Sequence, residues 1–228
     1  MEVRPVPGLE HEPYAEVWLK AVDDAVLDEA FAAAARIGKP GLEIWTTTKT
    51  PAVEPFLLAH GFSPHRRYVI SELDVGRAPD PGEPGHALIT VAERPDLGPA
   101  LNDLARIAHA DQPGRAGTDI GDDWLEWGLR AHPPESYFVA LEGDRVLAYG
   151  YLQQQDGIWW HGFLAVAREA RGRGVAGAIK RAQIRFAKEH GIASLRTATE
   201  VRLEGMRDLN RRLGYRPLYD EVVVRGAR

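Results

Sequence analysis

The sequence of 228 residues predicts an α/β fold built on a mixed β-sheet, and three observations carry this prediction. Helical and strand periodicities alternate along most of the chain. Glu142-Gly143-Asp144 separates two strand-type runs, which is typical of a β-hairpin. A short apolar run, residues 163–166, leads through a glycine-arginine turn into a helical pattern. Together these patterns predict a mixed sheet with helices on both faces.

Residues 1–75 open with a proline-broken segment, after which helical and strand patterns alternate twice. Residues 24–37 are rich in alanine and repeat their apolar positions at helical spacing. Residues 42–47 alternate in polarity and favour a strand. The same succession follows in 52–60, a short helix, and 68–73, a strand.

Residues 76–85 concentrate proline and glycine between periodic segments, which predicts an interdomain linker. Residues 86–228 then form the larger domain. Its expected elements are strand 86–91, helices 96–110 and 122–131, strands 137–141, 145–152 and 158–166, helix 175–186, strand 192–197, helix 205–213 and strand 221–224.

The order helix, glycine turn, strand, helix, Gly-aromatic and strand occurs twice, which indicates an internal repeat. The best local match sets Phe56-Leu-Leu-Ala-His-Gly-Phe62 on Leu209-Asn-Arg-Arg-Leu-Gly-Tyr215, 153 residues further on. Chance similarity of two helix–strand units is the alternative, since such units are common.

The turn Arg171-Gly-Arg-Gly174 lies between the predicted strand and the predicted helix, so it places glycines at a helix N-terminus. Unpaired backbone N–H groups and the positive end of the helix dipole converge there. Glycine lets a phosphate approach the backbone closely, and a pyrophosphate fits this chemistry. No Gly-Lys-Ser/Thr follows, which excludes the Walker loop.

The pattern Arg171-x-x-Gly174-x-Ala176 resembles the acyl-coenzyme A loop of the GNAT acetyltransferase superfamily. Met206-Arg-Asp-Leu-Asn210-Arg-Arg-Leu-Gly-Tyr215 resembles the motif that follows in that family and ends in Leu-Gly-Phe/Tyr. The resemblance covers 86–228 and implies a complete GNAT domain there. Residues 1–75 then form a truncated GNAT-like half-domain that lacks the loop and does not bind coenzyme A.

The resemblance implies direct acyl transfer from coenzyme A, acetyl-CoA in the first instance, to an amine acceptor. Backbone N–H groups of the loop bind the pyrophosphate in this interpretation, and arginine side chains add bonds to its oxygens. The preceding strand pairs its main chain with the pantetheine, and the N–H that polarises the thioester carbonyl falls near Val166. The residues expected to bind the cofactor are Leu164, Ala165, Val166, Arg171, Gly172, Arg173, Gly174, Val175, Ala176 and Asn210.

The GNAT motifs define the general acid and the general base less closely than the cofactor-binding residues. Many family members carry a tyrosine where this chain has Asn210, and an amide cannot supply a proton to the leaving thiolate. Water or Tyr219 is then needed as the acid. His161, on the strand before the loop, and Glu200, after the next strand, are the candidates for the general base. Glu200 has the alternative role of binding the charge of the amine.

Composition excludes several other classes of protein. There is no cysteine, so disulfides, thiolate metal sites and a cysteine nucleophile are ruled out. The eight histidines are scattered and no metal motif is present, so we expect no metal. No apolar run is long enough for a membrane span or a signal segment, which makes a cytoplasmic protein the default expectation.

The net charge is −5, yet residues 168–216 carry 13 Lys/Arg against 5 Asp/Glu. This segregation suits a small polyanionic ligand, while the acidic remainder argues against a nucleic-acid face. The rival functions are a catalytically degenerate acyl-CoA sensor and, less favoured by charge, a nucleic-acid binder. The acceptor, the acyl length and the oligomeric state stay open, a homodimer included.

Overall fold

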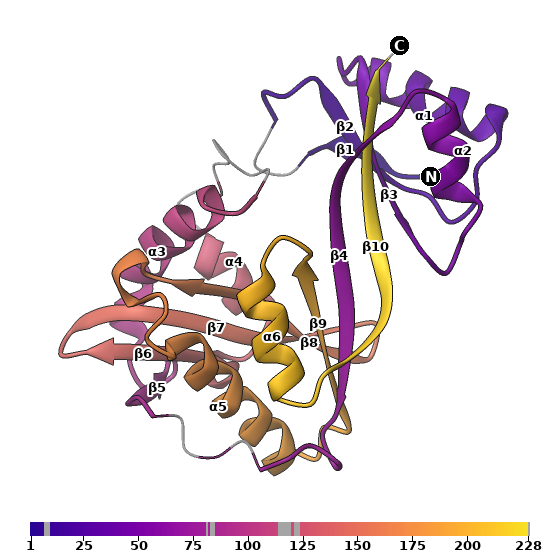
Figure 1. Ribbon diagram of the computed structural model, residues 1–228. Coiled ribbons are helices and arrows are strands. Elements are labelled where there is room, and N and C mark those ends of the chain that lie inside the picture. The colour runs from indigo at the N-terminus through magenta and orange to yellow at the C-terminus, as the bar shows by residue number, and fades with distance from the viewer. Residues whose placement is uncertain (7–9, 81, 83–84, 114–119, 121–123, 228) are drawn as a thin grey trace. The chain divides into compact units, whose positions relative to one another are not determined.

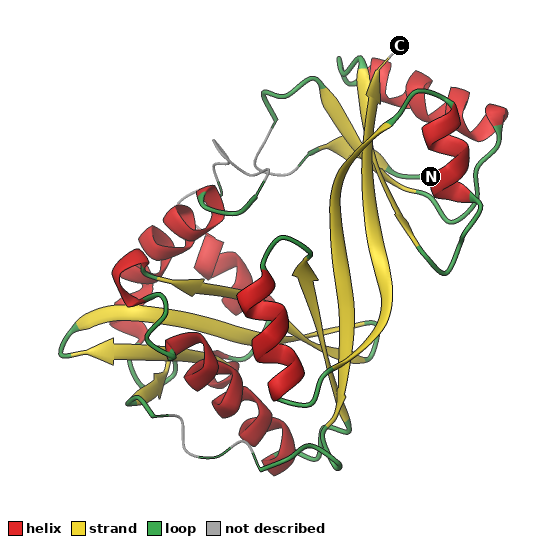
Figure 2. Cartoon of the chain, in the orientation of Figure 1, coloured by secondary structure: helices red, strands yellow, loops and turns green. Residues whose placement is uncertain are grey.

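A computed structural model of residues 1–228 shows the fold of the chain (Figures 1 and 2). The structure describes all of these residues except 7–9, 81, 83–84, 114–119, 121–123 and 228. The chain forms two compact units that are not contiguous in sequence. The first contains Met1–Ile70, Thr199–Leu203 and Leu218–Arg228, and the second contains Ser71–Ala198 and Glu204–Pro217.

The first unit has its strands in the order β1-β2-β3-β10-β4. Strand β2 runs parallel to β3, whereas β1 and β10 run antiparallel to their partners. Helices α1 and α2 connect these strands, and the apolar core includes Leu27, Ile44, Leu57 and Phe62. The elements are β1 Val3–Pro5, β2 Tyr14–Trp18, α1 Asp24–Arg36, β3 Gly41–Thr47, α2 Val53–Ala59, β4 Ser63–Asp74 and β10 Arg216–Ala227.

The second unit has the strand order β9-β8-β7-β6-β5, and the end of β4 lies beside β9. The pairs from β5 to β8 are antiparallel, and β8 and β9 are parallel. The elements are β5 Leu88–Thr90, α3 Gly98–Ala110, α4 Trp124–Ala131, β6 Tyr137–Glu142, β7 Arg145–Gln155, β8 Ile158–Val166, α5 Val175–Glu189, β9 Ser194–Glu200 and α6 Glu204–Arg212, with short 3-10 turns at Pro95–Leu97, Pro134–Ser136 and Arg168–Ala170.

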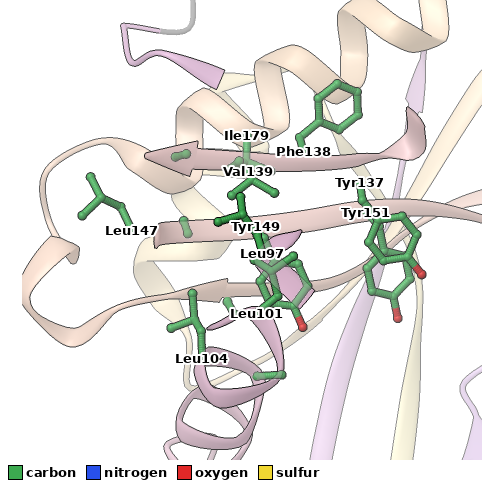
Figure 3. Close-up of a cluster of buried hydrophobic side chains, with 14 of the residues drawn as sticks. Leu97, Leu101, Leu104, Tyr137, Phe138, Val139, Leu147, Tyr149, Tyr151 and Ile179 are labelled. Carbon is green, nitrogen blue, oxygen red and sulfur yellow. The ribbon is translucent and has the colours of Figure 1, made fainter. Parts of the chain in front are cut away.

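Helices cover both faces of this sheet. Phe138 of β6 meets Phe186 of α5 edge-on, with ring centroids 5.9 Å apart. Its neighbour Tyr137 points to the other face, where its hydroxyl lies against Gly128 of α4. Because successive residues of a strand face opposite sides, α4 and α5 lie on opposite faces. Figure 3 shows the buried apolar side chains that fill this core, Ile179 of α5 among them.

The predicted α/β fold with a mixed sheet is confirmed, and β8 has the predicted bounds. Strands β1 and β2 were not predicted, because the prolines around them mask two short strands. The expected linker, 76–85, lies in the second unit, and residues 81 and 83–84 of it fall outside the described residues. The expected helix 122–131 is described from Trp124 onward.

Two βαβαβ segments of the chain match each other closely in their element bounds. We call residues 14–74 the N-terminal segment and residues 158–227 the C-terminal segment. Strands β3 and β4 become β9 and β10 when 153 is added to every residue number. The helix ends match as well: Phe62 N–H donates to Leu57 O, and Tyr215 N–H donates to Asn210 O.

Candidate coenzyme A site

The loop between β8 and α5 has the backbone geometry of an anion site. Gly172 and Gly174 have φ of +75° and +83°, in the left-handed region that glycine adopts without strain. No heavy atom lies within 4 Å of a Cβ placed on either glycine, so the space in front of the loop is open. Gly174 is the N-cap of α5, and no side chain caps this helix.

The backbone donors of the loop divide into two groups. Arg171 N–H and Arg173 N–H are bonded within the turns that precede the helix. The N–H groups of Gly172, Gly174 and the first turn of α5, residues 175–177, donate to no group among the described residues. A helix of 15 residues therefore presents its positive end and several free donors to one open space.

The arginine side chains hold the loop in place. Arg171 Nη2 and Arg168 Nη2 each lie 2.5 Å from a carboxylate oxygen of Asp111, which follows α3. Arg173 Nη2 pairs with Glu142 at 2.6 Å. Hydrogen bonds from Arg168, and then from Arg171, hold the pKa of the Asp111 carboxyl well below its usual range. These guanidinium groups therefore fix the loop, while its backbone N–H groups face the open space.

Strands β8 and β9 pair only at their beginnings, and this creates an open backbone edge. The pairs within the second unit are Trp159 with Leu195 and Trp160 with Arg196. Beyond them the two strands diverge (Figure 1). We call this stretch, which starts after Trp160 and Arg196, the parting of β8 and β9. The β7–β8 register also shifts between Gly150 and Leu152, as in a β-bulge.

The alternation of the β7–β8 ladder decides which groups point into the parting. Ala167 N–H donates to β7 at 2.8 Å, and Ala165 occupies the next hydrogen-bonded position. Leu164 and Val166 lie between these positions, so their N–H and C=O groups point away from β7. The predicted main-chain contacts thus have donors at Leu164 and Val166, whereas the backbone of Ala165 is used by β7.

A buried polar cluster lies below the parting, on the side of α5. The amide oxygen of Gln183 lies 2.7 Å from His161 Nδ1, and His161 Nε2 hydrogen-bonds the Tyr215 hydroxyl. Lys180 Nζ donates to Thr197 Oγ1 at 3.3 Å and lies 5.2 Å from the centroid of the Tyr215 ring. All five side chains are buried.

The predicted acid–base residues occupy different surroundings. His161 has both ring nitrogens engaged in the core, and burial, followed by the charge of Lys180, holds its pKa well below the usual range. Asn210 is buried on α6 in the same unit. Its neighbour Leu209 lies near Gly177, in the first turn of α5.

Glu200 and Tyr219 belong to the first unit. Glu200 is buried and accepts hydrogen bonds from the N–H and Nε of Arg202, both at 2.7 Å. The Lys49 ammonium lies 3.7 Å from the centroid of the Tyr219 ring. The structure therefore places His161 and Asn210 in one compact unit and Glu200 and Tyr219 in the other.

Sequence reasoning gave no site role to Thr197 and Tyr215 and missed Asp111, Lys180 and Gln183 altogether. Asp111 follows a helix and carries no motif. Lys180 and Gln183 lie on a second buried stripe of α5, beside the apolar stripe that predicts the helix. An alignment of the two segments at an offset of 153 residues would have found Lys180 and Gln183. In this alignment the two polar residues match the apolar Leu27 and Ala30.

A strand that parts from its parallel neighbour and leads into a glycine loop at an uncapped helix N-terminus defines an α/β class of fold with an open anion site. The model of the Acetyltransferase (GNAT) family matches residues 101–215. The chain belongs to this family.

Solved structures show the same fold. A GCN5-related N-acetyltransferase from Sphaerobacter thermophilus is similar over 99% of this chain and 75% of its own, with a TM-score of 0.72 and 17% identity. A tandem GNAT protein from the clavulanic acid biosynthesis pathway is similar over 94% of this chain and 75% of its own, with a TM-score of 0.70 and 17% identity. A GCN5-related N-acetyltransferase from Kribbella flavida is similar over 97% and 82%, with a TM-score of 0.63 and 17% identity.

No curated protein matches this chain in sequence. None of the helices in the described part of the chain has the length and apolar character needed to cross a membrane. Within the same residues, no three His, Asp or Glu side chains gather as a metal site would require.

Proposed function

We propose that this protein transfers an acyl group, acetyl in the first instance, directly from coenzyme A to an amine. One observation carries the proposal: the free N–H groups of the loop and of the first turn of α5 face an open space beside the open edge of β8. Backbone donors at a helix N-terminus suit a pyrophosphate. Gly172 and Gly174 allow its close approach, because a Cβ at either position would stand in that space.

Leu164 and Val166 give the pantetheine a main-chain partner. Both N–H groups and the C=O of Leu164 point into the parting of β8 and β9, so an extended amide chain pairs there as a strand would, while the C=O of Val166 accepts a hydrogen bond from Arg171 Nε. One of these N–H groups polarises the thioester carbonyl as negative charge develops on its oxygen. The acceptor nitrogen forms the new C–N bond, the C–S bond breaks, and the electron pair leaves on sulfur.

We assign the general base and the general acid to residues whose side chains can accept or donate a proton. His161 is a positioning residue and not the general base, because both of its ring nitrogens already have hydrogen-bond partners. Glu200 is the better candidate for the acceptor side, either as base or as partner of the ammonium, with Arg202 orienting its carboxylate. Asn210 binds the sulfur or the pantetheine but donates no proton to the thiolate, which leaves Tyr219 or water for that step.

We further propose that residues 1–75 are a GNAT-like half-domain without a cofactor site. The N-terminal segment matches the C-terminal segment from its first helix to its last strand but has no loop of the Arg171–Ala176 type. One coenzyme A per chain follows. Titration calorimetry with coenzyme A tests this, and a stoichiometry of two would contradict it.

Activity is tested by thiol release from acetyl-CoA with a panel of amines. We expect turnover with at least one small-molecule amine. A second candidate function, an acyl-CoA sensor without catalysis, is favoured by Asn210 in the place of the family tyrosine. Tight coenzyme A binding with no turnover on any amine would support the sensor and exclude the transferase.

A further inference from the structure

The buried polar cluster of the C-terminal segment replaces an apolar core in the N-terminal segment. The 153-residue offset sets four of the five cluster residues on residues of the first core, and the strand register sets the fifth, His161, on Val17. Every counterpart is apolar and at most 5% exposed. The pairs are His161 with Val17, Lys180 with Leu27, Gln183 with Ala30, Thr197 with Ile44 and Tyr215 with Phe62.

The fold itself does not need these polar side chains. The N-terminal segment builds the same helices and strands around Val17, Leu27 and Ile44. Burial of a polar group costs free energy even when it is hydrogen-bonded, and burial of a lone charge costs more. Residues that break the local pattern of a core are expected at functional sites. The C-terminal segment therefore keeps the cluster for a reason other than stability.

The position of the cluster connects it to the cofactor. Thr197 and His161 directly follow Arg196 and Trp160, the last residues that pair across β8 and β9. They thus stand at the closed end of the parting. The loop lies at the other end of the open edge, after Val166. A coenzyme A whose pyrophosphate sits on the loop and whose chain follows this edge directs its acyl end toward Thr197.

Lys180 is the one charge-bearing residue of the cluster. Among the described residues no carboxylate pairs with it, and its ammonium donates only to Thr197. Burial lowers the pKa of Lys180 to about 7. Tyr215 and His161, the other titratable groups that face it, stay neutral near pH 7, because burial raises the pKa of Tyr215 and lowers that of His161.

We propose that Lys180, acting through the hydroxyl of Thr197, is a positioning residue for acyl transfer that places a buried positive charge at the closed end of the parting. Thr197 accepts a hydrogen bond from Lys180, and its own hydrogen has no acceptor among the described residues. This hydrogen is directed toward the acyl end, where negative charge develops on the thioester oxygen and then on sulfur. The inference rests on the proposed acyl transfer.

The test compares Lys180→Met, Thr197→Val and Thr197→Ser with the unmodified chain, with Leu27→Met as the matched control at the counterpart of Lys180. The readouts are thiol release from acetyl-CoA with the best amine of the panel, coenzyme A affinity by calorimetry, and the midpoint of thermal unfolding. We expect Lys180→Met and Thr197→Val to lower kcat by about 10–100-fold. Thr197→Ser and Leu27→Met stay within about threefold of the unmodified protein.

A purely structural role gives a different pattern. In our proposal Lys180→Met leaves coenzyme A affinity within about threefold and does not lower the unfolding midpoint, because a lone buried charge is removed. In the unmodified protein kcat falls above pH 7 as Lys180 deprotonates. The pH profile of Lys180→Met lacks this falling limb. The inference is overturned if Lys180→Met keeps its kcat, if the limb persists, or if the loss of activity follows a loss of stability. If the unmodified chain binds coenzyme A but turns over no amine, the proposed function fails and the inference fails with it.

Discussion

The N-terminal and C-terminal segments share their element order and differ where a ligand would bind. In the N-terminal segment β2 pairs with β3 from Tyr14 to Trp18, along its whole length, and the chain reaches α1 after five residues. In the C-terminal segment β8 leaves β9 after two pairs, and the glycine loop precedes α5. The proposed site thus lies where a strand pair is open and one connection is longer.

The two helices that follow these strands begin differently. The side chain of Asp23 caps α1 and accepts the N–H of Val26 at 2.8 Å. Helix α5 begins at Val175, after the N-cap residue Gly174, and has no side-chain cap. In the first case the protein supplies the negative group that the helix N-terminus favours. In the second case the position stays open for a ligand, which shows how closely a helix cap and an anion site are related.

The largest expected effect comes from exchanging Leu57 and Asn210, which occupy equivalent positions. Leu57→Asn places an amide in the fully buried apolar core of the first unit, and we expect it to lower the free energy of unfolding by about 3–5 kcal/mol. Asn210→Leu costs about 1 kcal/mol or less and instead lowers turnover. Chemical denaturation and thiol release measure the two effects. Equal loss of stability in both variants would show that the two helices have the same role.

The next effect concerns the uncapped helix. Gly174→Asp brings a carboxylate to the N-terminus of α5, as Asp23 does for α1, and we expect coenzyme A to bind about 100-fold more weakly. Gly174→Asn is the matched control, because Asn has the same size and also tolerates the left-handed backbone. It should weaken binding by about tenfold or less, as measured by calorimetry. Equal affinities of the two variants would place the pyrophosphate elsewhere.

The pH dependence of stability distinguishes the two cores. The pKa of Lys180 is about 7 in the folded state and 10.5 ordinarily, so the cost of burying its charge is complete below pH 7 and disappears toward pH 10.5. We expect Lys180→Met to raise the unfolding midpoint by about 3–6 °C at pH 6. The gain narrows as pH rises through this window. Leu27→Met gives a difference that does not change with pH, and a pH-independent gain for Lys180→Met would contradict the assignment.

The comparison also shows what the sequence reveals. Local signals predicted the elements: the glycine caps at Gly61 and Gly214 and the loop at Gly174 were all found from composition and periodicity. The sequence carries no such signal for which strands pair. Alternating polarity predicts which face of a strand is buried, but it does not predict the neighbouring strand in the sheet. The parting of β8 and β9 therefore could not be predicted from the pattern of residues. Lys180 was missed for a related reason, since a lysine in a helix is normally solvated and only tertiary packing buries it.

The smallest expected effect concerns Asp111, which holds the loop that the N-terminal segment lacks. The pKa of Asp111 is lowered in the folded state, so its stabilising contribution is complete above its ordinary value near 3.8 and is lost as pH falls through the lowered one. Asp111→Asn should cost about 0.5–1 kcal/mol at pH 7, because the pair is near the surface, and should lose this difference at strongly acid pH.

The same variant separates two roles of Arg171. If its guanidinium fixes the loop, release from Asp111 loosens the backbone donors, and we expect coenzyme A affinity to fall by about threefold in calorimetry. If the guanidinium binds the pyrophosphate directly, release from Asp111 frees it and affinity rises, most of all at low salt. The bonds of Arg171 to Asp111 and to Val166 O favour the first outcome. A rise in affinity would show that Arg171 binds the ligand directly and does not serve mainly to hold the loop.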